Sequence, residues 1–584
     1  MKKETTGFAS IDKPQNDGYS LFARKPIIPN ISIYNLLQLV NFGKTKKSAI
    51  ECDDLYVKYD QIIDDAVIIS KAFKELGVKE GDIITVCMSN IYQAISTFLA
   101  CNRIGAAVTI LNRHMPFSNI CEYLNLYESP ILVNYDSSQE FNEKIKKQTA
   151  VRYIVTLKPE NINLLNICND YRNAKNFYEI DYNSLGSIAK YQHKGLPVNN
   201  ACDDALILYT SGTTGKPKPV VLTNKNVVAA SIYLKNSSHA KSLNGDKSLV
   251  SVPFSYPYGF VTSAMSTLMC NKTAVLAPSI SKENISYYLS KGINIIFGSP
   301  ALLELIMKNV PDDQDLSSVT TIISGGDFFL PTLYKRTQDF FAQHGAKNIE
   351  IGNGSGNAET VSCGTNPTGV KLKEHTVGKV LTGTDAIVVD PETMEEKKYN
   401  ELGMLCVAGD HVFKEYYKDP ERTSKAKFER NGKTYFKTGN LGSLDDEGYF
   451  TLMGRDARFY IVSSLDKVYC DRVQNIISYI DCIDSCAVVE IPDNEQLYKN
   501  VVYVVLKKGY LPTEETKRML YDAFRKPIRT HANEEEQLNS IEIPSRIEFV
   551  EELPRKEGME KIDYEFLKKD AISKEKGYSR VLKK

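Results

Sequence analysis

The sequence predicts an α/β protein with a large N-terminal domain of helix-covered parallel sheets and a small β subdomain. A small, mobile α+β C-terminal domain is expected to follow. Strands alternate with helices along the first half of the chain, which favours a parallel sheet covered by helices. Short β segments bounded by glycines fill about 376–450, and the pattern restarts after Gly454-Arg455. At 584 residues the chain is long enough for several cores, and we predict domains at 1–454 and 455–584.

Individual elements follow from periodicity and from turn residues. Residues 61–76 have helical spacing and stop at Gly77, which suits a C-terminal cap. The polar start, 1–30, is expected to wrap loosely over the first domain, and the charged stretch 529–540 to be a solvated loop. Helices are also predicted at 92–105, 474–480 and 514–525, and strands at 83–88, 106–111, 131–135, 153–156, 205–209, 274–277, 293–297, 487–491 and 501–506.

Composition narrows the class of protein. Hydrophobic residues make up 42% and charged residues 25%, as in soluble globular proteins. Lysine plus arginine equals aspartate plus glutamate, 72 each, so the balance favours neither a nucleic-acid partner nor an anionic membrane surface. The 12 cysteines include no CxxC pair and are expected to be buried thiols in a reducing compartment. Without an apolar start or a stretch of bilayer length, we expect a cytoplasmic protein with no membrane span.

The most informative stretch is Leu206-Ile-Leu-Tyr-Thr-Ser-Gly-Thr-Thr-Gly-Lys-Pro-Lys218. Its loop can offer backbone N–H groups, hydroxyls and cations to a polyphosphate. Only two residues separate Gly212 from Gly215, so this is not a Walker loop, which has four. On composition alone, a polar surface turn is an equal alternative. The candidate phosphate-binding residues are Thr210, Ser211, Gly212, Thr213, Thr214, Gly215, Lys216 and Lys218.

Two later glycine clusters add candidate positions. Ile323-Ser-Gly-Gly-Asp327 is a strand ending in a glycine pair, which by itself is as often only a tight turn. Asn353-Gly-Ser-Gly-Asn-Ala-Glu359 places a carboxylate after a glycine-rich loop. Mg²⁺ prefers one or two carboxylates together with water and phosphate oxygens, so Glu359 is a candidate ligand. A solvated loop carboxylate is the alternative.

The order Tyr-Thr-Ser-Gly-Thr-Thr-Gly-Lys-Pro-Lys at 209–218 resembles the phosphate loop of the AMP-forming adenylating enzymes. That superfamily comprises acyl-CoA synthetases, nonribosomal peptide adenylation domains and luciferases. The resemblance extends from about residue 50 to 570. It implies an adenine pocket at Gly325, Gly326, Asp327, Asn353, Gly354 and Ser355, a metal ligand at Glu359, a ribose contact at Asn440 and a hinge contact at Arg455.

The sequence departs from the family pattern at several of these positions. Ser355 replaces a tyrosine that stacks on adenine, and Asn440 replaces the aspartate that binds the ribose hydroxyls. An asparagine accepts hydrogen bonds only through its carbonyl oxygen. Loss of the charge-assisted bond would cost on the order of 1 kcal/mol of binding free energy. Further departures are Ala358, Ala457, Leu465 and Glu560.

The end of the chain resembles the family segment that carries a catalytic lysine. Leu553-Pro-Arg-Lys-Glu-Gly-Met-Glu-Lys-Ile-Asp-Tyr564 places Lys561 at that position. A neighbouring acidic Glu560 would favour the protonated ammonium, suited to stabilising charge at the α-phosphate. The walls of the acyl pocket are expected from 253–260, 298–303 and 324–329, with Tyr256, Gly259 and Gly298 as candidates and Tyr256 as a gate. A core aromatic is the alternative for Tyr256.

The resemblance implies an ATP-dependent enzyme that activates a small-molecule carboxylic acid as acyl-AMP. Thr210, Glu359 and Lys561 are the predicted catalytic residues. The resemblance implies ATP and Mg²⁺, with CoA or a phosphopantetheine thiol as acyl acceptor. Two alternatives stay open: an enzyme that loads an acyl carrier protein, and a degenerate member that binds nucleotide or acyl ligand without turnover. The sequence leaves the acid and the oligomeric state open.

Overall fold

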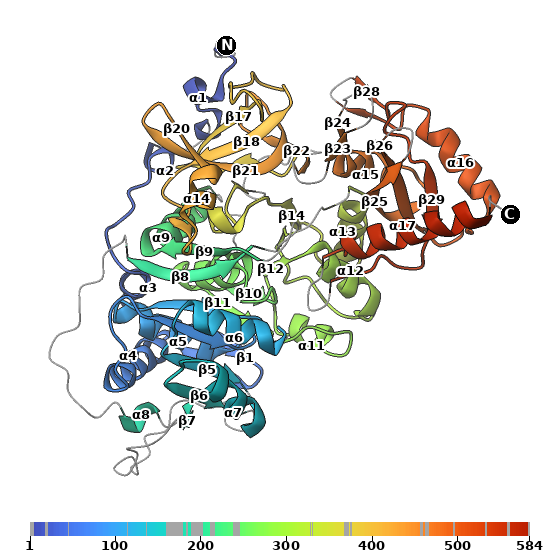
Figure 1. The fold of residues 1–584 in the computed structure, drawn as a ribbon. Helices are drawn as coiled ribbons and strands as arrows, with labels where there is room; N and C mark the ends of the chain where they lie inside the picture. The colour runs from blue at the N-terminus through green and yellow to red at the C-terminus, as the bar shows by residue number, and fades with distance from the viewer. Residues whose placement is uncertain are drawn as a thin grey trace.

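The computed structural model describes residues 5–17, 21–44, 46–113, 115–135, 137–158, 179–182, 185–188, 203–210, 217–237, 246–326, 329, 331–366, 373, 376–455, 459–461, 467–493, 497–531, 534–556 and 561–581. Figure 1 shows two large helix-covered sheets, a β subdomain above them and a separate C-terminal domain. None of the helices described is both long enough and apolar enough to cross a membrane.

The first large sheet, called the β8 sheet here, has eight strands in the order β19-β9-β8-β4-β3-β5-β6-β7. Its strands are parallel from β8 to β7, and β9 and β19 are added antiparallel. The strands are β3 (Ile83–Cys87), β4 (Ala107–Ile110), β5 (Ile131–Tyr135), β6 (Tyr153–Leu157), β7 (Glu179–Asp181), β8 (Asp204–Tyr209), β9 (Pro219–Thr223) and β19 (Glu415–Tyr416). The helices between them are α4 (Tyr59–Glu75), α5 (Tyr92–Arg103), α6 (Phe117–Leu126), α7 (Gln139–Gln148) and α8 (Leu185–Ile188).

The second large sheet, called the β12 sheet, has seven strands in the order β14-β13-β12-β10-β11-β1-β2. All neighbours are parallel except the β1–β2 hairpin. The strands are β1 (Ser48–Cys52), β2 (Leu55–Lys58), β10 (Lys247–Val250), β11 (Thr273–Leu276), β12 (Ile295–Gly298), β13 (Thr321–Ser324) and β14 (Glu350–Asn353). Its helices are α9 (Asn224–Ser237), η5 (Tyr258–Met265), α10 (Ser266–Met269), α11 (Ile285–Leu289), α12 (Pro300–Asn309) and α13 (Pro331–Gln343).

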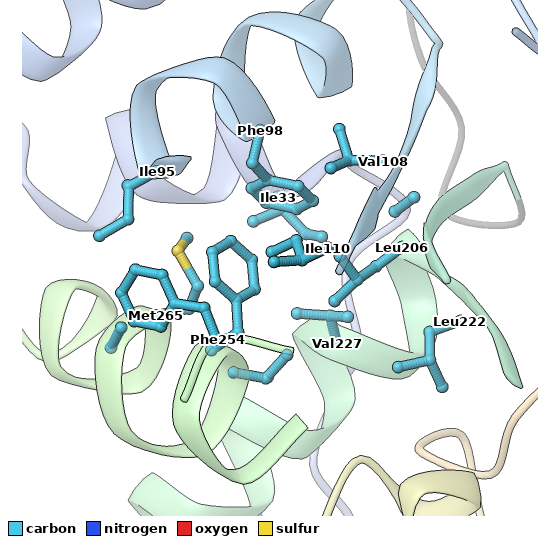
Figure 2. Packing of buried hydrophobic residues seen from close by; sticks show 14 of the residues in the cluster. Ile33, Ile95, Phe98, Val108, Ile110, Leu206, Leu222, Val227, Phe254 and Met265 are labelled. Atoms are coloured by element: carbon cyan, nitrogen blue, oxygen red, sulfur yellow. The ribbon is translucent and has the colours of Figure 1, made fainter. Parts of the chain in front are cut away.

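The main core lies between the two sheets, where helices of both halves meet (Figure 2). Phe98 of α5 packs edge-on against Phe260 of η5, with ring centroids 4.9 Å apart. Phe254 contacts the same Phe260 ring at 5.2 Å. Burying each such aromatic side chain contributes about 1.5–3 kcal/mol to the free energy of unfolding. This packing fixes the two sheets relative to each other.

Local sequence signals explain how individual elements end. Helix α4 ends as predicted at Gly77, which has φ +82°. The Gly77 N–H donates to the Lys74 carbonyl and the Val78 N–H to the Phe73 carbonyl. This pair of bonds is the Schellman motif, in which a glycine supplies the left-handed residue.

The β subdomain and the C-terminal domain follow. The subdomain consists of β17 (Asp385–Val389), β18 (Gly403–Ala408), β20 (Lys427–Arg430), β21 (Lys433–Leu444) and β22 (Phe450–Arg455), with α14 (Pro420–Ala426) and the small pair β15 (Thr365–Asn366) and β16 (Lys379–Val380). The C-terminal domain consists of β23 (Phe459–Ile461), β24 (Lys467–Tyr469), α15 (Cys470–Ile477), β25 (Ile483–Asp493), β26 (Leu497–Leu506), α16 (Glu514–Phe524), β29 (Arg546–Phe549) and α17 (Tyr564–Val581).

Two expectations about irregular segments are corrected: the start of the chain lies on the first domain as predicted but is bonded to it rather than loosely wrapped, and a predicted loop contains a hairpin. The start of the chain comprises α1 (Ala9–Asp12), η1 (Pro14–Asn16), α2 (Leu21–Arg24) and α3 (Ile33–Val40), and its first part, α1 with η1, is tied to the β subdomain. There Gln15 donates to the Thr384 carbonyl at 2.8 Å, and Lys13 pairs with Asp385. The stretch expected as a solvated loop contains the hairpin β27 (Arg529–His531) and β28 (Glu534–Glu536), because backbone pairing satisfies its N–H and C=O groups. The described cysteines are all free, as expected.

Candidate active site

A cavity of about 1430 Å³ lies where the carboxyl ends of both large sheets meet. Residues that follow β3, β4 and β8 line one side, and residues that follow β10 to β13 line the other. Ligands of open α/β sheets bind at the carboxyl ends of the strands. The described residues that line the cavity include Thr210, Lys218, Ser251, Tyr256, Tyr258, Pro278, Ser299, Gly325, Gly326, Gly356, Asn357, Ala358, Glu359, Tyr416, Thr438, Gly439 and Lys561.

Two hydrogen bonds between Thr210 and Lys218 close the base of the predicted phosphate loop. Strand β8 runs into Thr210, and β9 starts directly after Lys218. The Thr210 N–H donates to the Lys218 carbonyl, and the Lys218 N–H donates to Thr210 Oγ1, each at 3.1 Å. Both residues line the cavity. The predicted loop residues Ser211, Gly212, Thr213, Thr214, Gly215 and Lys216 lie outside the described residues.

Glu359 is held beside this loop by Tyr416, a residue that the sequence analysis did not select. Glu359 is buried in the short η6 helix (Ala358–Thr360), and the Tyr416 hydroxyl donates to its Oε1 at 2.6 Å. Tyr416 pairs with Val220 of β9, so its ring reaches the loop base, where Lys218 Nζ lies 5.6 Å from the ring centroid. Burial, together with the Glu359 carboxylate, raises the pKa of Tyr416. The phenol therefore remains a proton donor to Glu359.

The surroundings of Glu359 fit a Mg²⁺ ion that is shared with phosphates. Among the described residues, no group of three or more His, Cys, Asp or Glu side chains forms a complete protein cage for a metal. Within that part of the chain, no donor is bonded to the second carboxylate oxygen of Glu359. Mg²⁺ takes one or two carboxylates and completes its shell with water and phosphate oxygens. One available carboxylate oxygen at a phosphate-loop cavity satisfies that requirement.

The candidate adenine residues divide into two groups. Gly325 and Gly326 line the cavity, while Asp327 lies outside the described residues. Asn353, Gly354 and Ser355 are not among the described residues that line it. Backbone pairing explains this for Ser355, whose carbonyl accepts hydrogen bonds from the N–H groups of Gly364 and Thr365. The loop reaches the cavity only at the following residues, Gly356, Asn357, Ala358 and Glu359.

Asn440 is paired with a second asparagine. It is 4% exposed, and its Nδ2 lies 3.5 Å from Oδ1 of Asn357, which lines the cavity. Asn357 in turn donates from Nδ2 to the Thr438 carbonyl at 3.1 Å. In the β21–β22 register, Asn440 faces Arg455, so the predicted ribose and hinge positions are cross-strand neighbours. The amide of Asn357, rather than that of Asn440, reaches the cavity wall.

Lys561 comes to the cavity from the C-terminal domain. The Lys556 N–H donates to the Lys561 carbonyl at 2.9 Å, and Arg555 forms a β-bridge with Ile562. The pairing of these two segments brings Lys561 to the same cavity as Thr210 and Glu359. Glu560 lies outside the described residues.

An ion cluster joins the two domains on the α13 side, where α13 lies beside the C-terminal domain (Figure 1). Arg336 of α13 contacts Glu304 of α12 with both terminal nitrogens, at 3.0 and 3.1 Å. Its Nη1 also lies 2.9 Å from Oδ1 of Asp484 in β25. The guanidinium thus bridges the N-terminal and C-terminal domains in the arrangement that places Lys561 in the cavity.

Of the three candidate substrate-pocket residues, Tyr256 lines the cavity, whereas Gly259 and Gly298 are not among the described lining residues. Burial raises the pKa of the Tyr256 phenol to about 12. A Cβ at Gly259 would lie 2.2 Å from the Val252 carbonyl oxygen, and one at Gly298 would lie 2.7 Å from Leu302 Cδ2. Close packing therefore explains both glycines.

Comparison with known proteins agrees with this architecture. The family model described as "AMP-binding enzyme" matches residues 41–417, and the model "AMP-binding enzyme C-terminal domain" matches 472–558. The boundary at 455 lies between these ranges and remains a prediction.

Relatives and solved structures cover most of the chain. A long-chain-fatty-acid–CoA ligase of Bacillus subtilis is 25% identical over 90% of this chain and 92% of its own length. A 4-coumarate–CoA ligase of Vanilla planifolia is 24% identical over 76% and 79%. The crystal structure of ATP-bound MatB from Rhodopseudomonas palustris has a TM-score of 0.76 at 22% identity, and the match covers 93% of this chain and 99% of that chain. The predicted fold class is thereby confirmed.

Proposed function

Because this chain belongs to the AMP-binding enzyme family, as an AMP-forming acid–thiol ligase that uses ATP, we propose that it converts a carboxylic acid to acyl-AMP and transfers the acyl group to CoA. One observation carries the proposal. The cavity is lined at once by Thr210 and Lys218 of the phosphate loop, by Glu359, and by Lys561 of the other domain. These groups supply hydroxyl, cationic and carboxylate functions around one site.

In the proposed first step, a carboxylate oxygen of the acid attacks the α-phosphorus of ATP. The bond from that phosphorus to the oxygen bridging the β-phosphate breaks, and pyrophosphate leaves. Thr210 and Lys218 would bind the β- and γ-phosphates, and the Lys561 ammonium would stabilise charge that develops at the α-phosphate. Glu359 would hold Mg²⁺, which when bound neutralises phosphate charge.

In the second step, a thiol attacks the acyl carbon and AMP leaves. Closure of the C-terminal domain over the cavity would keep water from the mixed anhydride before that attack. We propose CoA as the thiol, and phosphopantetheine on a carrier protein is the competing outcome of the test below.

Acid-dependent exchange of labelled pyrophosphate into ATP tests the first step. A panel of carboxylic acids should contain at least one that supports exchange, and the same acid should then form a thioester with CoA. If an acid supports pyrophosphate exchange but its acyl group is transferred only to a phosphopantetheinylated carrier protein, the carrier and not CoA is the acyl acceptor. If no acid supports exchange, the result would favour a protein that binds nucleotide without turnover.

Asn440→Asp should tighten ATP binding by about fivefold, equivalent to about 1 kcal/mol. The Asn440 Nδ2 now donates to Asn357 Oδ1 at 3.5 Å; a carboxylate at 440 loses that bond, and its oxygens would accept from the ribose hydroxyls instead. The measurement is the Kd of ATP by calorimetry. The double variant that combines Asn440→Asp with Asn357→Ala is the control, because it removes the neighbouring amide. Unchanged or weaker ATP affinity of Asn440→Asp would contradict a ribose role.

Arg336→Ala should lower exchange by at most about fivefold, because the Asp484 pair is partly exposed and such pairs contribute about 0.2–1 kcal/mol. The expected effect arises from weaker closure of the C-terminal domain. Lys335→Ala, an exposed charge on the same helix, is the matched control. A double-mutant cycle of Arg336→Ala with Asp484→Ala should give a non-zero coupling energy for exchange. Strict additivity would show that the interdomain contact does not affect closure.

A further inference from the structure

We propose that Tyr258 sets the length of the acid, so that this chain activates short carboxylic acids rather than long-chain ones. The inference rests on the proposed function and names the substrate class for the same cavity. It follows from the position of one phenol ring at the end of two neighbouring strands.

The acid must occupy a part of the cavity that the phosphates leave free. Thr210, Lys218 and Lys561, the residues proposed to act on the phosphates, line the cavity. The acid must place its carboxylate beside the α-phosphate and extend away from it. One wall of the cavity is the carboxyl edge of the β12 sheet, with Ser251, Pro278, Ser299 and Gly325 after its strands, and we infer that the acid extends along it.

Tyr258 stands at that edge as the first residue of η5. This helix is a π-helix of 8 residues, Tyr258–Met265. π-helices are rare and are frequently found at functional sites. Met265, at the other end of the helix, packs in the core shown in Figure 2, whereas Tyr258 lines the cavity.

The Tyr258 hydroxyl is anchored on the backbone of both neighbouring strands. It lies 2.6 Å from the Ile323 carbonyl oxygen of β13 and 3.1 Å from the Gly298 carbonyl oxygen of β12. Gly298 and Ser324 are register partners, so the ring crosses between the ends of adjacent strands. Phe297 packs edge-on against the ring, with centroids 6.4 Å apart.

The ring also fills the space beside Gly325. A Cβ built on Gly325 would lie 3.5 Å from Tyr258 Cζ, in ordinary van der Waals contact. An acid that extends along this edge therefore meets a phenol that is held by two carbonyls and by a neighbouring ring. Further methylene groups would have to displace it and break its hydroxyl contacts with the two carbonyl groups.

The test compares the wild-type protein with Tyr258→Ala, Tyr258→Leu and Tyr258→Phe on straight-chain acids of increasing length. Pyrophosphate exchange gives kcat/KM for each acid. Beyond the length limit, each added methylene should lower the wild-type value by about 10-fold or more. Tyr258→Ala and Tyr258→Leu should move the optimum to longer acids, with gains of at least about 10-fold for acids that the wild type rejects. Tyr258→Phe, which keeps the ring, should keep the same optimum.

Three results would overturn the inference. Active Tyr258→Ala or Tyr258→Leu with the wild-type length profile would refute it and leave the proposed function intact, as would a wild-type optimum at long-chain acids. Absence of exchange with every acid in the wild type would refute both. Tyr258→Leu decides the matter if Tyr258→Ala does not fold, because leucine keeps an apolar side chain against Phe297.

Discussion

Replacing Lys561 by alanine is expected to lower acid-dependent pyrophosphate exchange by about 100- to 1,000-fold, with little change in the Kd of ATP. The reason is that Lys561 lines the cavity and its ammonium would act on charge that develops only as the α-phosphate is attacked. An interaction made mainly in the transition state contributes to kcat rather than to ground-state binding. The measurements are exchange kinetics and ATP binding by calorimetry.

Lys556→Ala is the matched control for this prediction. Lys556 is backbone-paired with Lys561 and carries the same charge, but it is absent from the described residues that line the cavity. It should therefore retain nearly full exchange activity. Lys561→Arg, which keeps the charge and changes the geometry, should recover part of the loss. Equal activities of Lys561→Ala and Lys556→Ala would mean that the Lys561 ammonium makes no specific contribution to exchange.

Much of the fold could be predicted because the signals are local. Alternating apolar runs and glycine turns predicted the strand at 131–135 and the helix ending at Gly77, which the structure confirms. The phosphate loop was found because its residues are contiguous, and its base between Thr210 and Lys218 lies at the cavity. Membership of the family, predicted from that loop, is confirmed by the family match.

The parts of the site that escaped prediction depend on contacts between distant segments. Tyr416 is 57 positions from Glu359, and only the antiparallel addition of β19 to β9 brings it there. Tyr258 was overlooked in favour of Tyr256, because which tyrosine reaches β12 and β13 depends on the π-helical start of η5. Asn357 carried a weak signal, as an amide inside the glycine-rich loop, but its pairing with Asn440 joins two separate motifs.

Glu359→Gln is expected to lower exchange by about 100-fold or more and to raise the Mg²⁺ concentration needed for half-maximal rate. Glutamine has the same shape and can still accept from the Tyr416 hydroxyl, so the change removes the charge that would attract the ion. The measurement is exchange as a function of Mg²⁺ at saturating ATP and acid. A wild-type Mg²⁺ dependence would show that this carboxylate does not hold the metal.

Tyr416→Phe tests whether the position of the Glu359 carboxylate matters, because it leaves the charge of that carboxylate unchanged. It removes only the hydroxyl that holds Oε1 at 2.6 Å, and it should raise the required Mg²⁺ by about 10-fold, the lower end of the effect of outer-shell changes. Because burial and the Glu359 carboxylate raise the pKa of Tyr416, the phenol loses its proton only at a higher pH than an ordinary tyrosine. The ratio of wild-type to Tyr416→Phe activity should therefore stay constant across neutral and mildly alkaline pH. A ratio that falls towards one within that range would mean that the hydroxyl ionises there and that the bond to Glu359 is lost in the wild type as well.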